Sequence, residues 1–376
     1  MDLWEIIASN FVSFIFGTTL TNIWNKLKNM IREKSIKKNI IKVITRNSED
    51  ICTIASTVPF YQNNSCIDIK INNKNKFYLS LPDNMKTNQN INVNEFKSID
   101  CINIDIEYES LGITKTKFWT ILEEQRQIVA NSFASRTGGM YFNGEKYGVL
   151  HSDGFGRTAD NIEDPKLFIE LFKTDYYTQR IIEKTLHKIN IRNKIDLDFL
   201  NHSMRGLRPS LGVSIILFLP SSNEIILTKR SKNASYNEEG KEWIYVSATE
   251  SFTTTDYDEF QKAPDLILCI QRGLKEELGI DKNTIQDIKI YNMFFEKNFF
   301  QDGILAIAYL NKYITYQDVV NLAAKDKELE ISSFLPIKNS KNELHKFITA
   351  NSKNLRPQTK YALENYIERM SYLYRE

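Results

Sequence analysis

The chain has 376 residues, with 49 basic and 47 acidic side chains and a formal net charge of +2 at pH 7. This length predicts roughly two domains, and the nearly balanced charge excludes the strongly basic class of protein that binds bulk nucleic acid. Because 12% of the residues are aromatic, with only 14 glycines and 8 prolines, the composition also excludes a disordered chain.

The cysteines and histidines are dispersed along the chain, and no C-x-x-C spacing occurs. A zinc site is therefore not expected, and free thiols in a reducing compartment fit this pattern best. The cysteines are Cys52, Cys66, Cys101 and Cys269.

Residues 6–24 carry no charge, and eight basic side chains follow between Lys26 and Arg46. This length suffices for a helix to cross a membrane, and the basic flank would then place the rest of the chain in the cytoplasm. The segment also contains Asn, Ser and Thr, which favours an amphipathic helix packed on the protein or lying at a membrane surface. Both alternatives stay open: a cytoplasmic protein, or one attached to the cytoplasmic face of a membrane through residues 6–24. We assign residues 1–46 to this part.

Residues 47–208 are predicted to form an α+β domain, for which no motif indicates a chemistry. Alternating apolar and polar residues predict strands, and Asn143-Gly144 predicts a type I′ turn because both residues tolerate positive φ. Asp164-Pro165 is expected to open a helix that runs to about Lys188. The predicted strands are 66–71, 77–81 and 102–106, and another helix is expected over 114–134.

From residue 209 to the end the pattern changes, and we predict a second domain. A nearly continuous apolar run over 211–219 and the segment 224–230 predict two paired strands. A helix is expected over 264–278, with Pro264 in its first turn. Further strands are predicted at 243–247, 288–296 and 304–309, and a last helix over 359–372.

Residues 272–280, RGLKEELGI, belong to the predicted helix 264–278 and its end. Arg272 and Glu276 are four residues apart and can pair, and positions 273, 276 and 277 share one face of the helix. Gly279 is expected to end the helix in the left-handed conformation. The stretch resembles the second half of the Nudix box, R-E-U-x-E-E-x-G-U (U aliphatic), and the order of strands, the Trp243 position and the late acidic run resemble a Nudix domain.

The resemblance implies an α/β/α sandwich around a mixed sheet for residues 209–376, joined to the α+β region before it. It also implies a divalent cation, Mg²⁺ or Mn²⁺, which carboxylate oxygens suit. Glu276 and Glu277, together with Glu250, are the candidate metal ligands. The partner would be a nucleotide or nucleoside diphosphate derivative.

The same resemblance implies roles for other residues. Glu277 and Arg272 are candidate catalytic residues, where Arg272 orients Glu276, and Glu328 is the candidate general base. Lys229 and Arg230 at the end of a strand are the candidate contacts to phosphate; solvated strand-end charges are the alternative.

The chain departs from the family pattern in three places. Gly273 replaces the first Glu of R-E-U-x-E-E, Pro264 stands where the pattern has an upstream Glu, and residues 246–251 lack the usual glycine pair. The helix then offers two carboxylates instead of three, with Glu250, Glu328 or Glu330 as substitutes. Three functions follow: a Nudix-type diphosphate hydrolase, a nucleotide-binding module that does not cleave, and a structural role in assembly.

Overall fold

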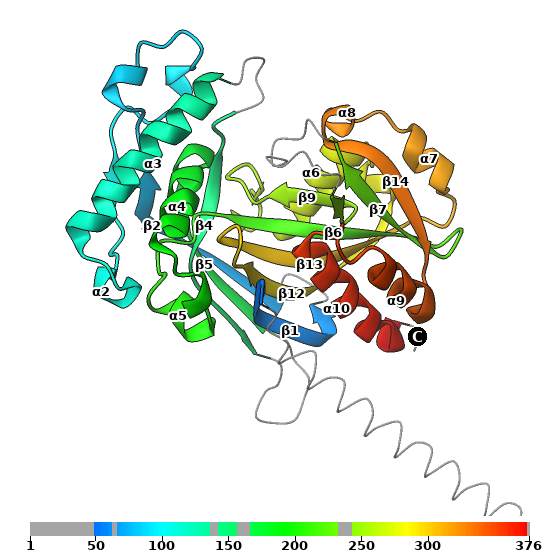
Figure 1. The fold of residues 1–376 in the computed structure, drawn as a ribbon. Helices are drawn as coiled ribbons and strands as arrows, with labels where there is room; N and C mark the ends of the chain where they lie inside the picture. Colours follow the sequence, from blue (N-terminus) through cyan, green and yellow to red (C-terminus); the bar gives the residue numbers. More distant parts are fainter. Residues whose placement is uncertain (1–48, 62–65, 136–141, 156–165, 232–242, 374–376) are drawn as a thin grey trace, which may run out of the picture. The chain divides into compact units, whose positions relative to one another are not determined.

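A computed structural model describes residues 49–61, 66–135, 142–155, 166–231 and 243–373 (Figure 1). The chain divides into two compact units, Met1–Thr45 and Arg46–Glu376, and the described residues belong to the second unit. The predicted boundary at residues 208/209 lies inside that unit, and the predicted anchor segment 6–24 lies outside the described residues. Of the helices that the described ranges contain, none has the length and apolar character to cross a membrane.

The larger sheet has eight strands in the order β1-β12-β13-β6-β7-β14, with β8 paired to β7 and β9 paired to β6. The β13–β6 pair is parallel and the remaining pairs are antiparallel, so the sheet is mixed. The strands predicted at 211–219 and 224–230 are confirmed. The strands are β1 (Ile51–Tyr61), β6 (Leu211–Leu219), β7 (Glu224–Arg230), β8 (Ile244–Tyr245), β9 (Ala248–Ser251), β12 (Ile285–Glu296), β13 (Gln301–Leu310) and β14 (Ile331–Lys338).

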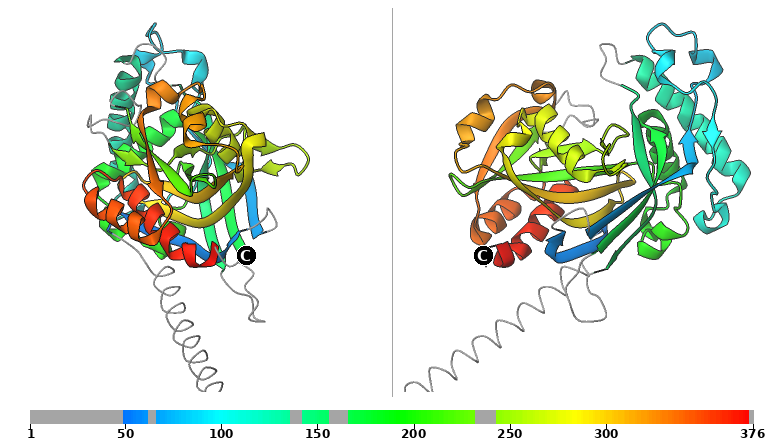
Figure 2. Two further views of the ribbon diagram at one scale, coloured as in Figure 1. Left: turned by 90° about the vertical axis from the view of Figure 1, so that its right-hand side faces the viewer. Right: turned by 180° about the vertical axis from the view of Figure 1, so that it is seen from behind.

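Helices cover both faces of this sheet, so the central strand β6 is apolar almost throughout (Figures 1 and 2). Successive side chains of a strand point to opposite faces: Ile215 joins the core on the side of helix α6, and Ile216 joins the core on the side of α9 and α10. These helices are α6 (Leu266–Leu278), α9 (Lys341–Ala350) and α10 (Pro357–Leu373), and short helices α7 (Tyr316–Asn321) and α8 (Lys327–Glu330) precede β14.

The smaller sheet has four strands in the order β3-β2-β5-β4, in which β2 and β5 are parallel. Helices α3 and α4 pack against each other beside it. The elements are β2 (Ile67–Tyr78), β3 (Cys101–Ile102), β4 (Glu145–Phe155), β5 (Lys166–Asp175), α2 (Tyr108–Leu111), α3 (Lys115–Ser135), α4 (Tyr176–Ile189) and α5 (Leu197–Asn201), and a separate hairpin contains β10 (Tyr257–Asp258) and β11 (Ala263–Pro264).

The predicted helix over residues 165–188 is wrong in its first half. Lys166–Asp175 is strand β5, in which Leu167, Ile169 and Leu171 are buried at every second position. The helix starts only at Tyr176, where the Asp175 side chain caps it by accepting a hydrogen bond from the backbone N–H of Thr178.

The predicted type I′ turn at Asn143-Gly144 is also wrong, because neither residue has a positive φ. Asn143 is buried instead, and its side chain joins two separate elements. Its Oδ1 accepts a hydrogen bond from the backbone N–H of Tyr177 at 2.8 Å, while its Nδ2 donates to the backbone oxygen of Glu95 at 2.9 Å. Its tertiary contacts therefore override its local turn preference.

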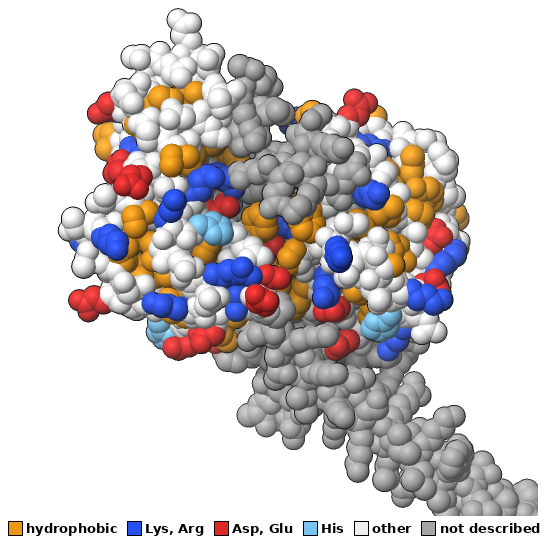
Figure 3. Space-filling model, viewed as in Figure 1, with side chains coloured by type: hydrophobic (Ala, Val, Ile, Leu, Met, Phe, Trp, Pro, Cys, Tyr) orange, Lys and Arg blue, Asp and Glu red, His pale blue; other side chains and the backbone are white. Residues whose placement is uncertain are grey.

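The two sheets are joined through β4. The backbone N–H of Tyr147 donates to the oxygen of Phe252 beyond β9, and the N–H of Val149 donates to the oxygen of Arg208 before β6. On the face shown in Figure 3, acidic and basic side chains of the described residues are intermixed.

Candidate functional site

The helix α6 that carries the RGLKEELGI stretch ends as its sequence predicts, at Leu278, but it begins at Leu266, two residues after the predicted start. The Asp265 side chain accepts from the N–H of Ile267 at its start, and Gly279 ends it with φ 75°. A Cβ at Gly279 would lie 2.4 Å from the backbone oxygen of Ala323, so this position needs glycine for its conformation and for space. Pro264 lies before the helix, in β11, and not in its first turn.

Gly273 has a steric explanation. A Cβ at this position would lie 2.7 Å from the Cβ of Glu250 on β9, which real side chains do not tolerate. Strand β9 therefore packs directly on the helix where the Nudix box has a glutamate. The Glu250 side chain takes that space, so the third carboxylate beside Glu276 and Glu277 comes from the sheet.

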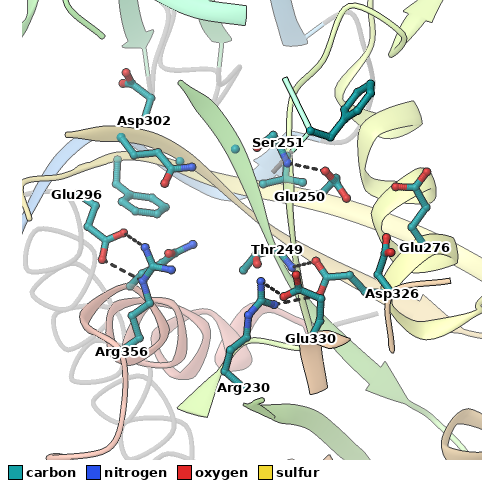
Figure 4. Close-up of a pocket in the computed structure, with 18 residues that line it drawn as sticks. Arg230, Thr249, Glu250, Ser251, Glu276, Glu296, Asp302, Asp326, Glu330 and Arg356 are labelled. Atoms are coloured by element: carbon teal, nitrogen blue, oxygen red, sulfur yellow. Dashed lines mark hydrogen bonds and ion pairs between the residues drawn. The ribbon is translucent and has the colours of Figure 1, made fainter. Parts of the chain in front are cut away.

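A pocket of about 370 Å³ opens between α6, the edge of β9 and the ends of β12 and β13. Its wall is mostly polar, and Figure 4 shows carboxylates on both sides of it. Besides Gly212, Val213 and Gly303 of the sheet, its lining residues are Phe142, Arg230, Thr249, Glu250, Ser251, Glu276, Glu277, Phe294, Glu296, Gln301, Asp302, Asp326, Glu330, Arg356 and Gln358.

One end of the pocket, which we call the crowded end, contains Glu250, Glu276, Glu277, Asp326 and Glu330. Glu277 is buried, and its Oε1 accepts from the N–H of Thr249 at 3.0 Å. Arg230 lies 3.6 Å from Glu277 and also pairs with Glu330. Burial raises the pKa of Glu277 to about 8; Arg230 lowers it, and Glu250 and Glu330 raise it further. These carboxylates therefore repel one another.

Arg272 lies behind the wall of the crowded end and contacts two of its carboxylates. Its Nε and Nη2 each donate to the buried carboxylate of Asp256 at 2.8 Å. Its Nη1 lies 3.1 Å from Glu250 and 3.4 Å from Glu276, which matches the predicted i, i+4 pairing. One guanidinium group thus holds a carboxylate from each of three segments.

The opposite end, which we call the paired end, has one arginine for each carboxylate. Arg356 donates to both oxygens of Glu296, at 3.3 and 2.9 Å, and its guanidinium lies over the ring of Phe299 at 4.4 Å. Arg208 donates to both oxygens of Asp302, and both side chains are fully buried. Bidentate pairs of this kind are strong and geometrically specific.

The pocket brings together Glu250, Glu276, Glu277 and Arg230 of the predicted site residues, with Arg272 directly behind them. Lys229 and Glu328 do not line it. Lys229 precedes Arg230 on a strand and so points to the opposite face. Glu328 is exposed, and Glu330, two positions later on α8, faces the pocket.

Sequence reasoning missed Asp256, the main partner of Arg272, and the acids Glu296 and Asp302 of the paired end. Asp256 lies sixteen positions before Arg272, where no motif spacing indicates it. Glu296 is the last residue of β12 and Asp302 is the second residue of β13, so their proximity follows from the β12–β13 hairpin.

The crowded end fits a divalent cation in the chemistry of its donors. Its side chains are carboxylates, the ligands that Mg²⁺ and Mn²⁺ prefer, and their mutual repulsion would be relieved by a cation. Among the described residues, however, no three acidic, His or Cys side chains already form a group that could hold a metal ion. Arg230 and Arg272 occupy these oxygens instead.

No family model and no curated protein matches the chain. Among solved structures, the chain is similar to a NUDIX-family hydrolase from Clostridium perfringens, with 13% identity and a TM-score of 0.25. The similarity covers 41% of this chain and 94% of that one. This likeness is too distant to establish a family, so the functional assignment depends on the pocket.

Proposed function

We propose that the pocket binds a diphosphate-containing nucleotide derivative with a divalent cation at its crowded end, and that it hydrolyses the diphosphate. The observation that carries this proposal is the packing of Glu250 on Gly273, because it returns a third carboxylate to the face of Glu276 and Glu277. The resemblance of residues 272–280 to the second half of the Nudix box supports the same reaction class.

In this proposal Glu250, Glu276 and Glu277 would hold Mg²⁺ or Mn²⁺. The bound cation would supply charge stabilisation at the diphosphate and lower the pKa of water. Arg272, fixed by Asp256, keeps Glu250 and Glu276 in place. Glu330 takes the role of general base that the sequence suggested for Glu328, because Glu330 lines the pocket and Glu328 does not.

The test is phosphate release from a panel of nucleoside diphosphate derivatives, measured with and without Mg²⁺. We expect Mg²⁺-dependent release that falls by roughly 100-fold or more in Glu277→Gln, in line with the loss of an important charge-stabilising group. Glu343→Gln is the matched control, since it makes the same change on the exposed side of α9. Equal rates for wild type and Glu277→Gln would contradict the hydrolase proposal.

A second candidate function is binding without cleavage. It is favoured by one observation: Arg230 and Arg272 already neutralise the carboxylates that a cation would need. In that case the nucleotides raise the melting temperature, while wild type and Glu277→Gln release no phosphate. The same panel thus separates the two candidates.

A further inference from the structure

Lys146 of β4 reaches the pocket wall from the smaller sheet. Its side chain is buried, and its Nζ donates to the Oε1 of Gln179 at 2.6 Å and to the Oγ of Ser251 at 3.0 Å. The ammonium group also lies over the ring of Tyr176, 5.3 Å from the centroid. Ser251 lines the pocket and follows Glu250 directly.

The backbone makes the same connection. Lys146 forms an antiparallel bridge with Thr253, and the N–H of Tyr147 donates to the oxygen of Phe252 at 3.0 Å. The N–H of Ser251 in turn donates to Glu250 Oε1 at 2.8 Å. The segment that orients Glu250 is therefore held by β4 on its outer side and by α6 on its inner side.

Burying the charged side chain of Lys146 lowers the stability of the folded protein. Its two hydrogen-bond partners are neutral, and burial lowers its pKa to about 8. The charges that face it are Glu250 from β9, Asp175 at the end of β5, and Arg180 and Glu183 from α4; of these only Arg180 repels it. Burying a charge without a close ionic partner has a desolvation cost that an apolar residue would not have, so Lys146 is a candidate for a role beyond packing.

We propose that Lys146 is a positioning residue of the pocket: it fixes Ser251, and with it the β9 wall that carries Glu250, so that the smaller sheet is part of the ligand site. This inference rests on the proposed function, because the ligand it concerns is the cation and diphosphate at the crowded end. It extends the site beyond residues 209–376, which alone carry the resemblance to a known family.

The test measures binding of Mn²⁺ with inorganic pyrophosphate to the full chain by calorimetry, together with the melting temperature. Groups that orient the ligands of a metal typically change affinity by roughly 10- to 100-fold. We expect Lys146→Met to bind roughly tenfold more weakly while its melting temperature stays level or rises. Ser251→Ala should weaken binding too, and the double variant should bind no worse than the weaker single one.

Lys173→Met is the matched control, because Lys173 lies on the neighbouring strand β5 opposite Tyr147 and does not reach the pocket. Wild-type binding by Lys146→Met would overturn the inference. So would a lower melting temperature and weaker binding in Lys146→Met alongside normal binding in Ser251→Ala, since that result indicates a structural role only. If the wild type does not bind Mn²⁺ and pyrophosphate, the proposed function fails and this inference fails with it.

Discussion

The two ends of the pocket compensate their carboxylates in different ways. At the paired end, Glu296 and Asp302 each have an arginine of their own, which donates to both oxygens. At the crowded end, Arg230 is shared by Glu277 and Glu330 (Figure 4). Arg272, behind the pocket wall, is likewise shared by three acids, Glu250, Asp256 and Glu276. Two arginines therefore pair with four acids of the crowded end and with Asp256 behind it.

This difference distinguishes carboxylates that stabilise the fold from carboxylates that could bind a ligand. A buried carboxylate with its own bidentate arginine is satisfied, so it has little to gain from a ligand. Carboxylates that share an arginine and repel one another are stabilised when a cation binds between them. The paired end therefore holds strands together, and the crowded end is the part of the pocket at which we propose that a cation binds.

The largest effect is expected at the paired end. Arg208→Met leaves Asp302 as a buried charge without its partner, which should lower the free energy of unfolding by about 3–5 kcal/mol. Urea denaturation measures this change. The double variant Arg208→Met/Asp302→Leu should recover most of it, because no charge then stays buried alone. A single variant as stable as wild type would mean that Asp302 is not held by this pair.

At the crowded end, removing a charged group should stabilise the protein instead, by an amount that depends on pH. Burial raises the pKa of Glu277 to about 8, from 4.5 in the unfolded chain. Between these values the folded protein binds a proton that the unfolded chain releases, so its stability falls as pH rises through this window. Each pKa unit of difference between the folded and unfolded states corresponds to about 1.4 kcal/mol in the free energy of unfolding.

We therefore expect Glu277→Gln to be more stable than wild type at pH 8, by about 2–4 kcal/mol on that scale, and equal to it near pH 4. Glu296→Gln is the matched variant of the paired end and should lose stability at pH 8, because Arg356 loses half of its bidentate partner. Urea denaturation of the three proteins at both pH values measures this contrast. A Glu277→Gln variant that is less stable at pH 8 would remove the distinction between the two ends.

The fold of residues 209–376 was largely predictable, because its elements are specified locally. The apolar run of β6 and the left-handed Gly279 each follow from their own sequence neighbourhood. The segment 166–175 was not predictable in the same way. Its LFIELF run fits a strand or a buried helix equally, and pairing with β2 and β4 decides between them.

The residues of the site likewise divide into those that local sequence predicts and those that depend on tertiary packing. Arg272 is four residues before Glu276, and Glu276 and Glu277 share the helix face of position 273, so spacing alone predicts these neighbours. The contact of Glu250 with Gly273 and the pairing of Asp256 with Arg272 depend on how β9 and the loop after it pack on α6. The choice of Arg230 over Lys229 follows from strand alternation once the burial of one face is known.

The smallest predicted effect tests whether Glu250 is held at the crowded end by its contact with Gly273 of α6. Alanine should stabilise a helix interior by about 1 kcal/mol relative to glycine, but at position 273 its Cβ would collide with Glu250, and overpacking costs about 1–3 kcal/mol. We expect Gly273→Ala to destabilise the wild type by about 1 kcal/mol, since the collision outweighs the helix preference.

In a Glu250→Gly background the collision is absent, so the same Gly273→Ala change should stabilise the protein by about 1 kcal/mol, as helix propensity alone dictates. Urea denaturation of the four proteins measures this reversal of sign. If Gly273→Ala has the same effect in both backgrounds, Glu250 does not contact α6 in solution. The third carboxylate would then be missing from the crowded end, and the case for a cation there would depend on Glu276 and Glu277 alone.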